Sequence, residues 1–241
     1  MLINYTDIFI VSAPACLGTD ADSLEAIMAG NEAGANGCAV DLDVTADGIA
    51  VLCANGGFTL ADGSRLALSE ATFAEARAAF PKIVSVGQVI ELAKSCAAKL
   101  CIHLKDVTSC AQLQLVLHHA DYADGAYFTE LTLEQAAKLA ARFPTLQFMA
   151  DVLETPENQN ALLHAAQSAG LFGLRVAPSV VPPTLCEAAH SVGLLVATTE
   201  CHDEAMLQRL IGMGVNFIET LRPDVAYGLL PTEADQEQLT I

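Results

Sequence analysis

Length, composition and charge narrow the class of protein before any motif is considered. The chain has 241 residues, of which 53% are hydrophobic and 17% are charged, so a packed globular protein is expected and a disordered one is excluded. Its 29 acidic residues against 11 basic ones give a net charge of −18, which repels nucleic acid and anionic membrane surfaces. We therefore expect a solvated acidic surface and no nucleic-acid partner.

The cysteines and the N-terminus bear on location. The 8 cysteines form no Cys-x-x-Cys pair, and most lie in apolar runs such as GCAVDL and KLCIHL, which predicts buried free thiols. The N-terminus has no basic region of a signal peptide, and no stretch reaches the roughly 18 apolar residues of a membrane span. These features predict a reducing, cytoplasmic location and no membrane span.

Short β-branched runs alternate with alanine-rich amphipathic stretches along the chain, which predicts repeated strand and helix units. The expected strands, in chain order, are 7–13, 37–44, 48–54, 99–105, 125–131, 146–152, 171–178, 193–199 and 215–221. The run 48–54 closely follows the run 37–44 and is expected to accompany it. If 48–54 forms a short extra strand outside the barrel, eight strands remain to form the barrel.

Helix start and stop signals follow several of these strands. Capping residues, prolines and glycines delimit three clear helices, at 24–34, 133–143 and 184–193. Because each helix follows a strand, the sheet is expected to be parallel and buried on both faces, which explains why its strands are apolar runs. No linker or charge block divides residues 1–241, so we expect one domain.

Two architectures are built from such units, the closed TIM (β/α)8 barrel and the open doubly wound sheet. The strand count favours the barrel, and barrels of this kind have about 250 residues. An open dinucleotide-binding sheet would carry G-x-G-x-x-G after its first strand, where this chain has SAPACLG. We therefore predict a single-domain α/β TIM barrel.

Polar residues lie near the C-terminal ends of two expected strands, where barrel active sites form. Ala39, Asp41 and Asp43 share one face of their strand, and His103 and Lys105 share one face of theirs. One interpretation brings both aspartates and the imidazole to a softer divalent ion such as Zn²⁺, with Lys105 facing an anion. In the other, Lys105 pairs with Asp41 and His103 donates a hydrogen bond, giving a satisfied polar cluster.

Five segments, in order, resemble the short motifs of the glycerophosphodiester phosphodiesterase family, including its H-R-G, E-x-D, T-x-D-G-x-x-V, H-D and I-E-x-K patterns. They are IFIVSAPA, DADSLEAIMAGNEAGANGCAVDLDVTADGIAVLCAN, LALSEATFAEARAAFPKIVSVGQVIELAK, KLCIHLKD and GLLVATTECHDEAMLQRLIGMGVNFIETLRPDVA. That family consists of metal-dependent barrels of lipid metabolism that hydrolyse glycerophosphodiesters to an alcohol and glycerol 3-phosphate. The resemblance implies a phosphoric diester hydrolase ancestry, Ca²⁺ or Mg²⁺, and a small phosphate-containing ligand.

Most of the catalytic residues that the resemblance would supply are replaced. Asp41 stands at the aspartate of E-x-D and Lys105 at the lysine of I-E-x-K, whereas His103 stands at the glutamate of I-E-x-K. The family's His-Arg pair, the glutamate of E-x-D and its second histidine correspond to Ala13, Pro14, Ala39 and Ala54. Loss of a general acid or base costs about 10²- to 10⁴-fold in rate, so the resemblance implies a degenerate enzyme.

Three hypotheses follow. The first is a non-catalytic or strongly impaired family member. The second is an active phosphoric diester hydrolase with a rearranged site, in which Asp41 and Asp43 bind metal, His103 and Lys105 act in catalysis, and Lys105, Arg175 and Glu200 bind substrate. The third, from a different class, is a structural barrel whose outer helices form a homo-oligomer or a binding module. Arg175 has two interpretations, since an inward guanidinium meets either an anionic ligand or a structural ion-pair partner.

Overall fold

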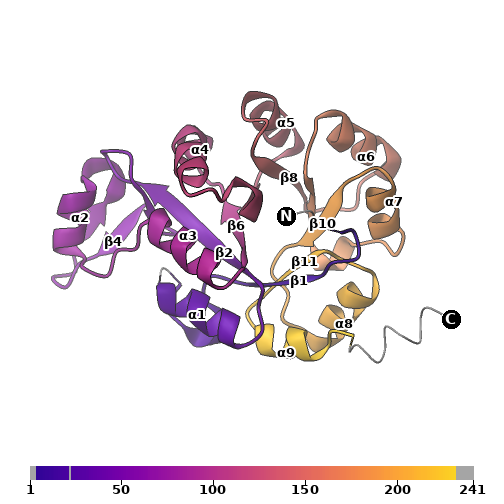
Figure 1. The fold of residues 1–241 in the computed structure, drawn as a ribbon, viewed down its shortest axis with the longest axis horizontal. Helices are drawn as coiled ribbons and strands as arrows, with labels where there is room; N and C mark the ends of the chain where they lie inside the picture. Colours follow the sequence, from indigo (N-terminus) through magenta and orange to yellow (C-terminus); the bar gives the residue numbers. More distant parts are fainter. Residues whose placement is uncertain (1–3, 22, 232–241) are drawn as a thin grey trace.

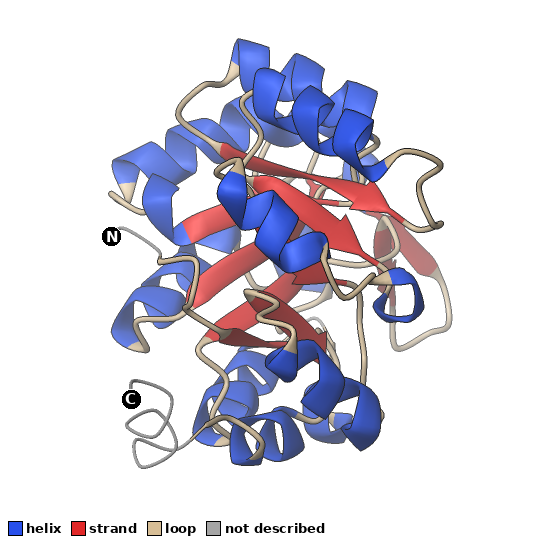
Figure 2. Ribbon diagram, turned by 90° about the vertical axis from the view of Figure 1, so that its right-hand side faces the viewer, coloured by secondary structure: helices blue, strands red, loops and turns tan. Residues whose placement is uncertain are grey.

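The computed structural model describes residues 4–21 and 23–231, and its centre is a closed ring of parallel strands (Figure 1, Figure 2). The ring closes because β1 pairs with both β11 and β2. The strands of the ring are β1 (Phe9–Ser12), β2 (Gly37–Val44), β6 (Lys99–His103), β7 (Ala126–Thr129), β8 (Gln147–Val152), β9 (Gly173–Val176), β10 (Leu195–Thr198) and β11 (Phe217–Thr220). The predicted TIM barrel is therefore confirmed, with each expected barrel strand present.

Helices surround the ring in the described part of the chain (Figure 1). They are α1 (Leu24–Glu32), α2 (Phe73–Ala79), α3 (Val86–Ser95), α4 (Cys110–His119), α5 (Leu133–Arg142), α6 (Gln159–Ser168), α7 (Leu185–Ser191), α8 (Glu204–Gly212) and α9 (Pro223–Gly228). Short 3₁₀ turns lie at Cys16–Gly18, Leu68–Glu70, Val107–Ser109, Ala123–Gly125 and Pro178–Val180. Capping sets the starts of two expected helices, because Ser23 accepts from the Ala26 N–H and Thr132 forms a capping box with Gln135.

A small lobe interrupts the repeat between β2 and β6. The expected excursion is present as β3 (Ala50–Leu52), which pairs antiparallel with β2. It continues into a hairpin of β4 (Gly57–Thr59) and β5 (Arg65–Ala67) that the sequence pattern did not predict. The lobe has its own apolar core, in which the rings of Phe58 and Phe80 stack with centroids 4.4 Å apart.

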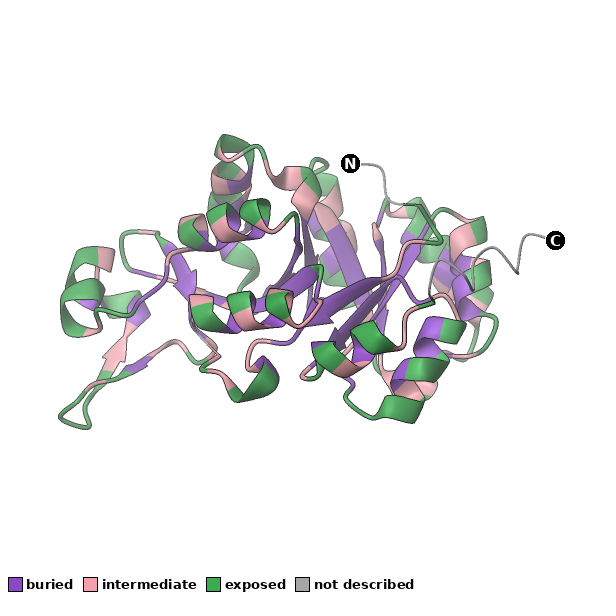
Figure 3. Cartoon of the chain, turned by 60° about the horizontal axis from the view of Figure 1, so that its bottom comes forward, coloured by how far each residue is buried: buried purple, intermediate pink, exposed green. Residues whose placement is uncertain are grey.

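The barrel strands are largely buried (Figure 3), and alternation along each strand separates two apolar layers. The layer between strands and helices includes Val40, Ile102, Phe128, Ala150 and Ile218. The layer inside the ring includes Ala39, Cys101, Tyr127, Met149 and Phe217. Because the residues two further along point the same way, Asp41, His103, Asp151 and Glu219 rise from the inner layer toward the C-terminal mouth of the barrel.

The cysteines lie mostly in these layers. Seven of the eight are buried and Cys96 is half-buried, and none of these described residues forms a disulfide. Burial raises the pKa of Cys38 and of Cys110 to about 12, so these two thiols stay protonated at neutral pH. No helix in residues 4–21 and 23–231 is long and apolar enough to cross a bilayer.

The buried Asn216 side chain links the N-terminal segment to the barrel through hydrogen bonds. The carboxamide oxygen of Asn216 accepts from the Val196 N–H at 3.0 Å and contacts His190 Nε2 at 2.7 Å. Its nitrogen donates to the carbonyl oxygens of Tyr5 at 2.9 Å and Asp7 at 3.2 Å. All four amide hydrogen-bonding positions are thus used at a site without solvent exposure.

We expect Asn216→Ala to lower the free energy of unfolding by roughly 3 kcal/mol, because it leaves buried donors and acceptors without partners. Urea unfolding followed by circular dichroism measures the change. Asn160→Ala, at an exposed position of α6, is the matched control and should leave stability nearly unchanged. Equal stability of the two variants would contradict the conclusion that the buried Asn216 side chain stabilises the fold through its hydrogen bonds.

Candidate functional site

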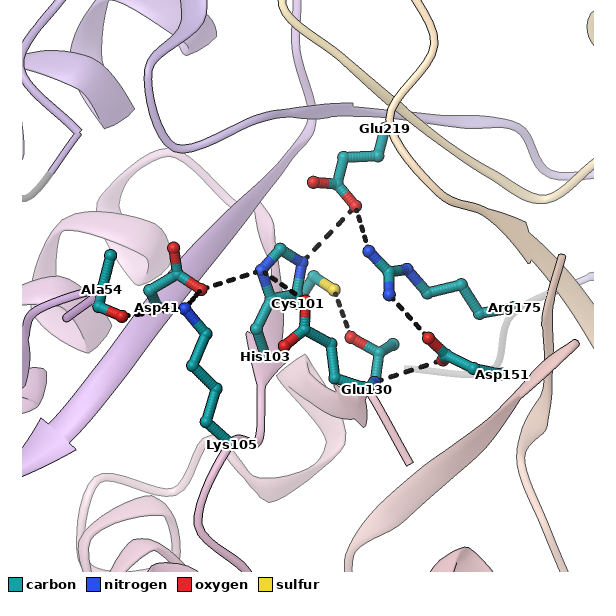
Figure 4. A network of polar contacts seen from close by, with 10 residues as sticks. Asp41, Ala54, Cys101, His103, Lys105, Glu130, Asp151, Arg175 and Glu219 are labelled. Atoms are coloured by element: carbon teal, nitrogen blue, oxygen red, sulfur yellow. Dashed lines mark hydrogen bonds and ion pairs between the residues drawn. The ribbon is translucent and has the colours of Figure 1, made fainter. Parts of the chain in front are cut away.

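Charged side chains converge on a hollow of about 490 Å³ at the C-terminal mouth of the barrel (Figure 4). The charged residues that line it include Asp41, His103, Lys105, Glu130, Arg175 and Glu219. Two larger hollows, of about 750 and 830 Å³, lie beside the lobe and at the N-terminal ends of the middle strands. We place the candidate site at the smaller one, because barrel active sites form at this mouth and its charged groups contact one another.

Asp41, in β2, is held by two cationic side chains from β6 and the loop after it. Its Oδ1 lies 3.2 Å from His103 Nδ1 and 2.9 Å from Lys105 Nζ, and that ammonium also donates to the Ala54 carbonyl oxygen at 3.0 Å. Burial alone would raise the pKa of Asp41, but hydrogen bonds from His103 and Lys105 lower it to about 2. Both contacts expected of the satisfied polar cluster are therefore present.

His103 lies among three carboxylates and is only 5% exposed. Besides Asp41, Glu130 Oε1 lies 3.8 Å from its Nδ1, and Glu219 Oε2 lies 3.4 Å from its Nε2. Burial alone would lower the pKa of His103, but the Asp41 and Glu219 carboxylates raise it well above its ordinary value. The surrounding carboxylates therefore favour the protonated form of the side chain, the imidazolium.

Arg175, in β9, faces the interior and continues the same network. Its Nη1 donates to Asp151 Oδ2 at 2.9 Å, and its Nη2 donates to Glu219 Oε2 at 3.3 Å. Burial raises the pKa of Glu219, yet His103 and Arg175 more than offset it and hold that pKa below its ordinary value. Burial raises the pKa of Asp151, with Arg175 offsetting part of the effect. Positive and negative groups thus alternate across the mouth.

The structure brings together some of the sequence-predicted site residues and leaves one apart. Asp41, His103 and Lys105 are in contact, and Arg175 faces inward with carboxylate partners. Glu200 lines the same hollow, and its Oε1 lies 3.7 Å from His202 Nδ1. Asp43 does not line the hollow. Its Oδ1 accepts from the Val44 N–H at 2.7 Å.

The structure also places the four residues that the resemblance aligns with catalytic positions. Ala13 and Ala39 are buried, Pro14 lines the hollow, and Ala54 contributes its carbonyl oxygen to Lys105. None of these side chains carries a titratable group or a guanidinium.

Sequence reasoning missed three acids of the site, Glu130, Asp151 and Glu219. Each closes an apolar strand, in the runs YFTE, FMAD and FIET, where a charged residue is unexpected in a buried strand. These acidic residues could therefore have been noticed in the sequence. Their pairing with Arg175 and His103 could not be predicted, because it depends on the order of strands around the barrel.

A metal of the kind that the resemblance implies needs several uncommitted oxygen ligands. Asp41 is already bound by Lys105 and His103, and Asp43 lies outside the hollow. Within the described ranges, no three His, Cys, Asp or Glu side chains are placed to hold a metal ion. The residues present therefore do not fit a Ca²⁺ or Mg²⁺ site, nor a Zn²⁺ site on Asp41, Asp43 and His103.

Comparison with known proteins gives a clear result for the fold. No family model and no curated protein matches the sequence. Solved structures do match, among them a glycerophosphoryl diester phosphodiesterase from Silicibacter pomeroyi DSS-3, described as putative, with 17% identity, a TM-score of 0.74 and 92% of each chain covered. A glycerophosphodiester phosphodiesterase from Agrobacterium tumefaciens C58 has 17% identity and a TM-score of 0.75, with 92% of this chain and 99% of that chain covered.

A third match bears on ligands. A phosphodiesterase from Oleispira antarctica, solved in complex with the product sn-glycerol-3-phosphate, has 15% identity and a TM-score of 0.74, with 92% of this chain and 96% of that chain covered. The class defined by these matches is the TIM barrel. Within that class, the chain has the fold of the glycerophosphodiester phosphodiesterases over more than nine-tenths of its length.

We expect the protonated His103 to make stability depend on pH. A raised pKa contributes stability that is complete below the unfolded value of about 6.5 and is lost as pH rises through the folded value. The lowered pKa of Asp41 acts oppositely, since its contribution is present above about pH 4 and is lost as pH falls through about 2.

The measurement is urea unfolding of wild type and His103→Gln at pH 6.5, 7.5 and 8.5. The stability advantage of the wild type should shrink by up to about 1.4 kcal/mol per pH unit over this range, because only the wild type holds the extra proton. A difference that stays constant with pH would show that His103 is neutral in the folded protein.

We also expect Glu219→Gln to lower the free energy of unfolding by about 3 to 5 kcal/mol, because it leaves two buried cations short of a charged partner. Glu134→Gln removes a carboxylate from an exposed ion pair with Lys138 and is the matched control, expected to have almost no effect. Similar unfolding midpoints in urea for the two variants would contradict the importance of the buried network.

Proposed function

We propose that the protein is a degenerate member of the glycerophosphodiester phosphodiesterase family, a barrel that no longer hydrolyses phosphodiesters. The observation that carries this proposal is the state of Asp41. It is the one carboxylate of the E-x-D motif that the chain keeps, and Lys105 and His103 both occupy its Oδ1. A carboxylate oxygen neutralised by two internal cations is a poor ligand for a divalent ion.

The chemistry of the reaction points the same way. Cleavage of a phosphodiester needs a cation at the phosphoryl oxygens, a group that activates the nucleophile and a group that protonates the leaving alkoxide. Ala13, Pro14 and Ala54 supply no acid, base or guanidinium at their positions. His103 is the one imidazole in the hollow, and its buried nitrogens face carboxylates, so it is badly placed to exchange a proton with a substrate.

Ligand binding at the mouth is restricted by the same pairing. Each cation of the network contacts at least one carboxylate, and four carboxylates surround three cations. A small phosphate-containing ligand, of the kind bound in the Oleispira antarctica structure, would have Lys105 as its most accessible partner. It would have to compete with Asp41 for that ammonium, so we propose weak binding of phosphate here.

The same proposal keeps residues 1–241 as one domain in a reducing, cytoplasmic compartment. The eight cysteines, all among the described residues, form no disulfide, and this supports the reducing environment. A barrel without turnover is retained for binding or assembly, so a homo-oligomer formed through the outer helices remains compatible with this proposal.

We expect no divalent-dependent release of glycerol 3-phosphate when pure protein is incubated with glycerophosphocholine or glycerophosphoethanolamine, because neither a metal ligand set nor an acid and base pair is in place. An enzyme-coupled assay for glycerol 3-phosphate, run with Ca²⁺, with Mg²⁺ and with EDTA, measures this. An active phosphodiesterase in the same buffers is the positive control.

Asp41→Asn is the matched control variant. Turnover by the wild type that EDTA abolishes and that Asp41→Asn removes would overturn the proposal and establish the rearranged active site instead. Turnover that survives Asp41→Asn would indicate a contaminating enzyme and leave the proposal in place.

A further inference from the structure

The hollow of about 830 Å³ lies at the end of the barrel opposite the mouth, and we refer to it as the basal hollow. It forms where three strands begin, because Lys99 starts β6, Gly125 precedes β7 and Gln147 starts β8. A second lysine, Lys94 in the last turn of α3, also lines it. Among the described residues, the basal hollow shares no lining residue with the hollow at the mouth.

Lys99 is a buried ammonium without a carboxylate in contact with it. The residue is 6% exposed, and its Nζ donates to the backbone carbonyl oxygen of Asp124 at 2.7 Å. No carboxylate of the described residues lies at ion-pair distance from this nitrogen, whereas Lys105 and Lys138 each have one. Burial lowers the pKa of Lys99, and the charge of Asp124 offsets only part of that effect. Because lysine is almost never buried unless it is paired, this ammonium lacks a counter-charge.

Lys94 has a similar arrangement on the exposed side of the same hollow. Its Nζ donates to the carbonyl oxygen of Ala120 at 2.7 Å, and no carboxylate in residues 4–21 and 23–231 lies at ion-pair distance from it. Both ammoniums are therefore fixed to the turn between α4 and β7, each through one of its three donors. The other donors are left for a ligand.

The acidic residues of the basal hollow do not pair with these lysines. Asp121 and Asp124 line it, but both are exposed, so water and salt screen their carboxylates. A buried charge acts through a medium of lower dielectric constant, so Lys99 attracts an anion more strongly than these acids repel it. The half-buried Gln147 adds a neutral carboxamide to the wall.

We propose that the basal hollow binds a small phosphate-containing anion, with Lys99 and Lys94 as its cationic partners. Lysine binds phosphate as a point charge, and a dianion would supply the counter-charge that both ammoniums lack. Small-molecule sites have volumes of roughly 300 to 1,000 Å³, so the hollow has room for an organic group beside the phosphate. The proposal goes beyond the proposed function, which concerns the mouth, and does not depend on it.

The test is isothermal titration calorimetry of the full chain with inorganic phosphate and with glucose 6-phosphate, at an ionic strength held constant with NaCl. We expect one anion per chain. Lys99→Met keeps the length of the side chain and removes its charge, so it should weaken binding at least about tenfold, and Lys94→Gln should weaken it in the same direction. Tighter binding of the ester identifies an organic phosphate as the ligand, and equal binding identifies free phosphate.

Matched controls separate this site from net charge and from the mouth. Lys82→Gln removes one exposed lysine outside the basal hollow, and Lys105→Gln removes the accessible cation of the mouth, so both should bind the anions like the wild type. The amide resonances of Gly125 and Gln147 should shift when phosphate is added to the wild type. If Lys99→Met does not fold, the exposed Lys94→Gln decides the test.

Three outcomes would overturn the proposal. They are no heat of binding beyond that of NaCl, equal weakening by Lys82→Gln and Lys94→Gln, and binding that Lys105→Gln abolishes while Lys94→Gln leaves it intact. A loss of Tm in Lys94→Gln that is the same with and without phosphate would also overturn it, because it would show that the lysine only stabilises the turn. Failure of the proposed function is distinguishable, since it would appear as turnover at the mouth that EDTA abolishes.

Discussion

Neutralisation of buried charge at the barrel mouth is the constraint on which the rest of this site depends. Arg175 and Glu219 are almost fully buried, and an isolated charge in such a position would cost far more than a folded protein can tolerate. In this protein each of these charges lies beside an opposite one. Positive and negative side chains alternate in the order Lys105, Asp41, His103, Glu219, Arg175 and Asp151. The network joins five of the barrel strands, so each charge is positioned by a different part of the sequence.

That arrangement limits what the mouth can do for a ligand. Electrostatic catalysis and tight anion binding require charges that are held in place yet not already neutralised. Here each cation has a carboxylate at ion-pair distance, and the protein as a whole carries a charge of −18. An incoming phosphate would lose existing ion pairs before it gained new ones. The features that stabilise the mouth are therefore the same features that argue against hydrolysis.

Much of the fold could be predicted from the sequence because it is local. The strand Gly37–Val44 has the bounds expected from its apolar run, and Ser23 and Thr132 mark helix starts through capping within a few residues. The hairpin Gly57–Ala67 was missed because its two strands have three residues each and only Phe58 among them is buried, so no periodicity develops.

The site was harder to predict for a different reason. Asp41 and His103 could be linked, since they are register partners on neighbouring strands. Glu219 and Arg175 could not, because their contact spans 44 residues and requires both the strand order and the inward orientation of a guanidinium. Sequence left open whether Arg175 meets a ligand or a carboxylate, and only the closed ring of strands selects the carboxylates Asp151 and Glu219.

The proposed degeneracy also accounts for the residues at the mouth taken together. In the E-x-D and I-E-x-K motifs that the chain resembles, the positions of Ala39 and His103 carry glutamates that would help Asp41 hold a divalent cation. In the proposed degenerate site, an alanine and a protonated imidazole in place of these glutamates remove two negative charges and add one positive charge, which more than offsets the loss of a divalent ion. The apolar layer between strands and helices is separate from the mouth, so such an exchange leaves the barrel itself intact. Under the same proposal, internal ion pairs in place of a metal ion explain how the fold persists without the family's metal ligands.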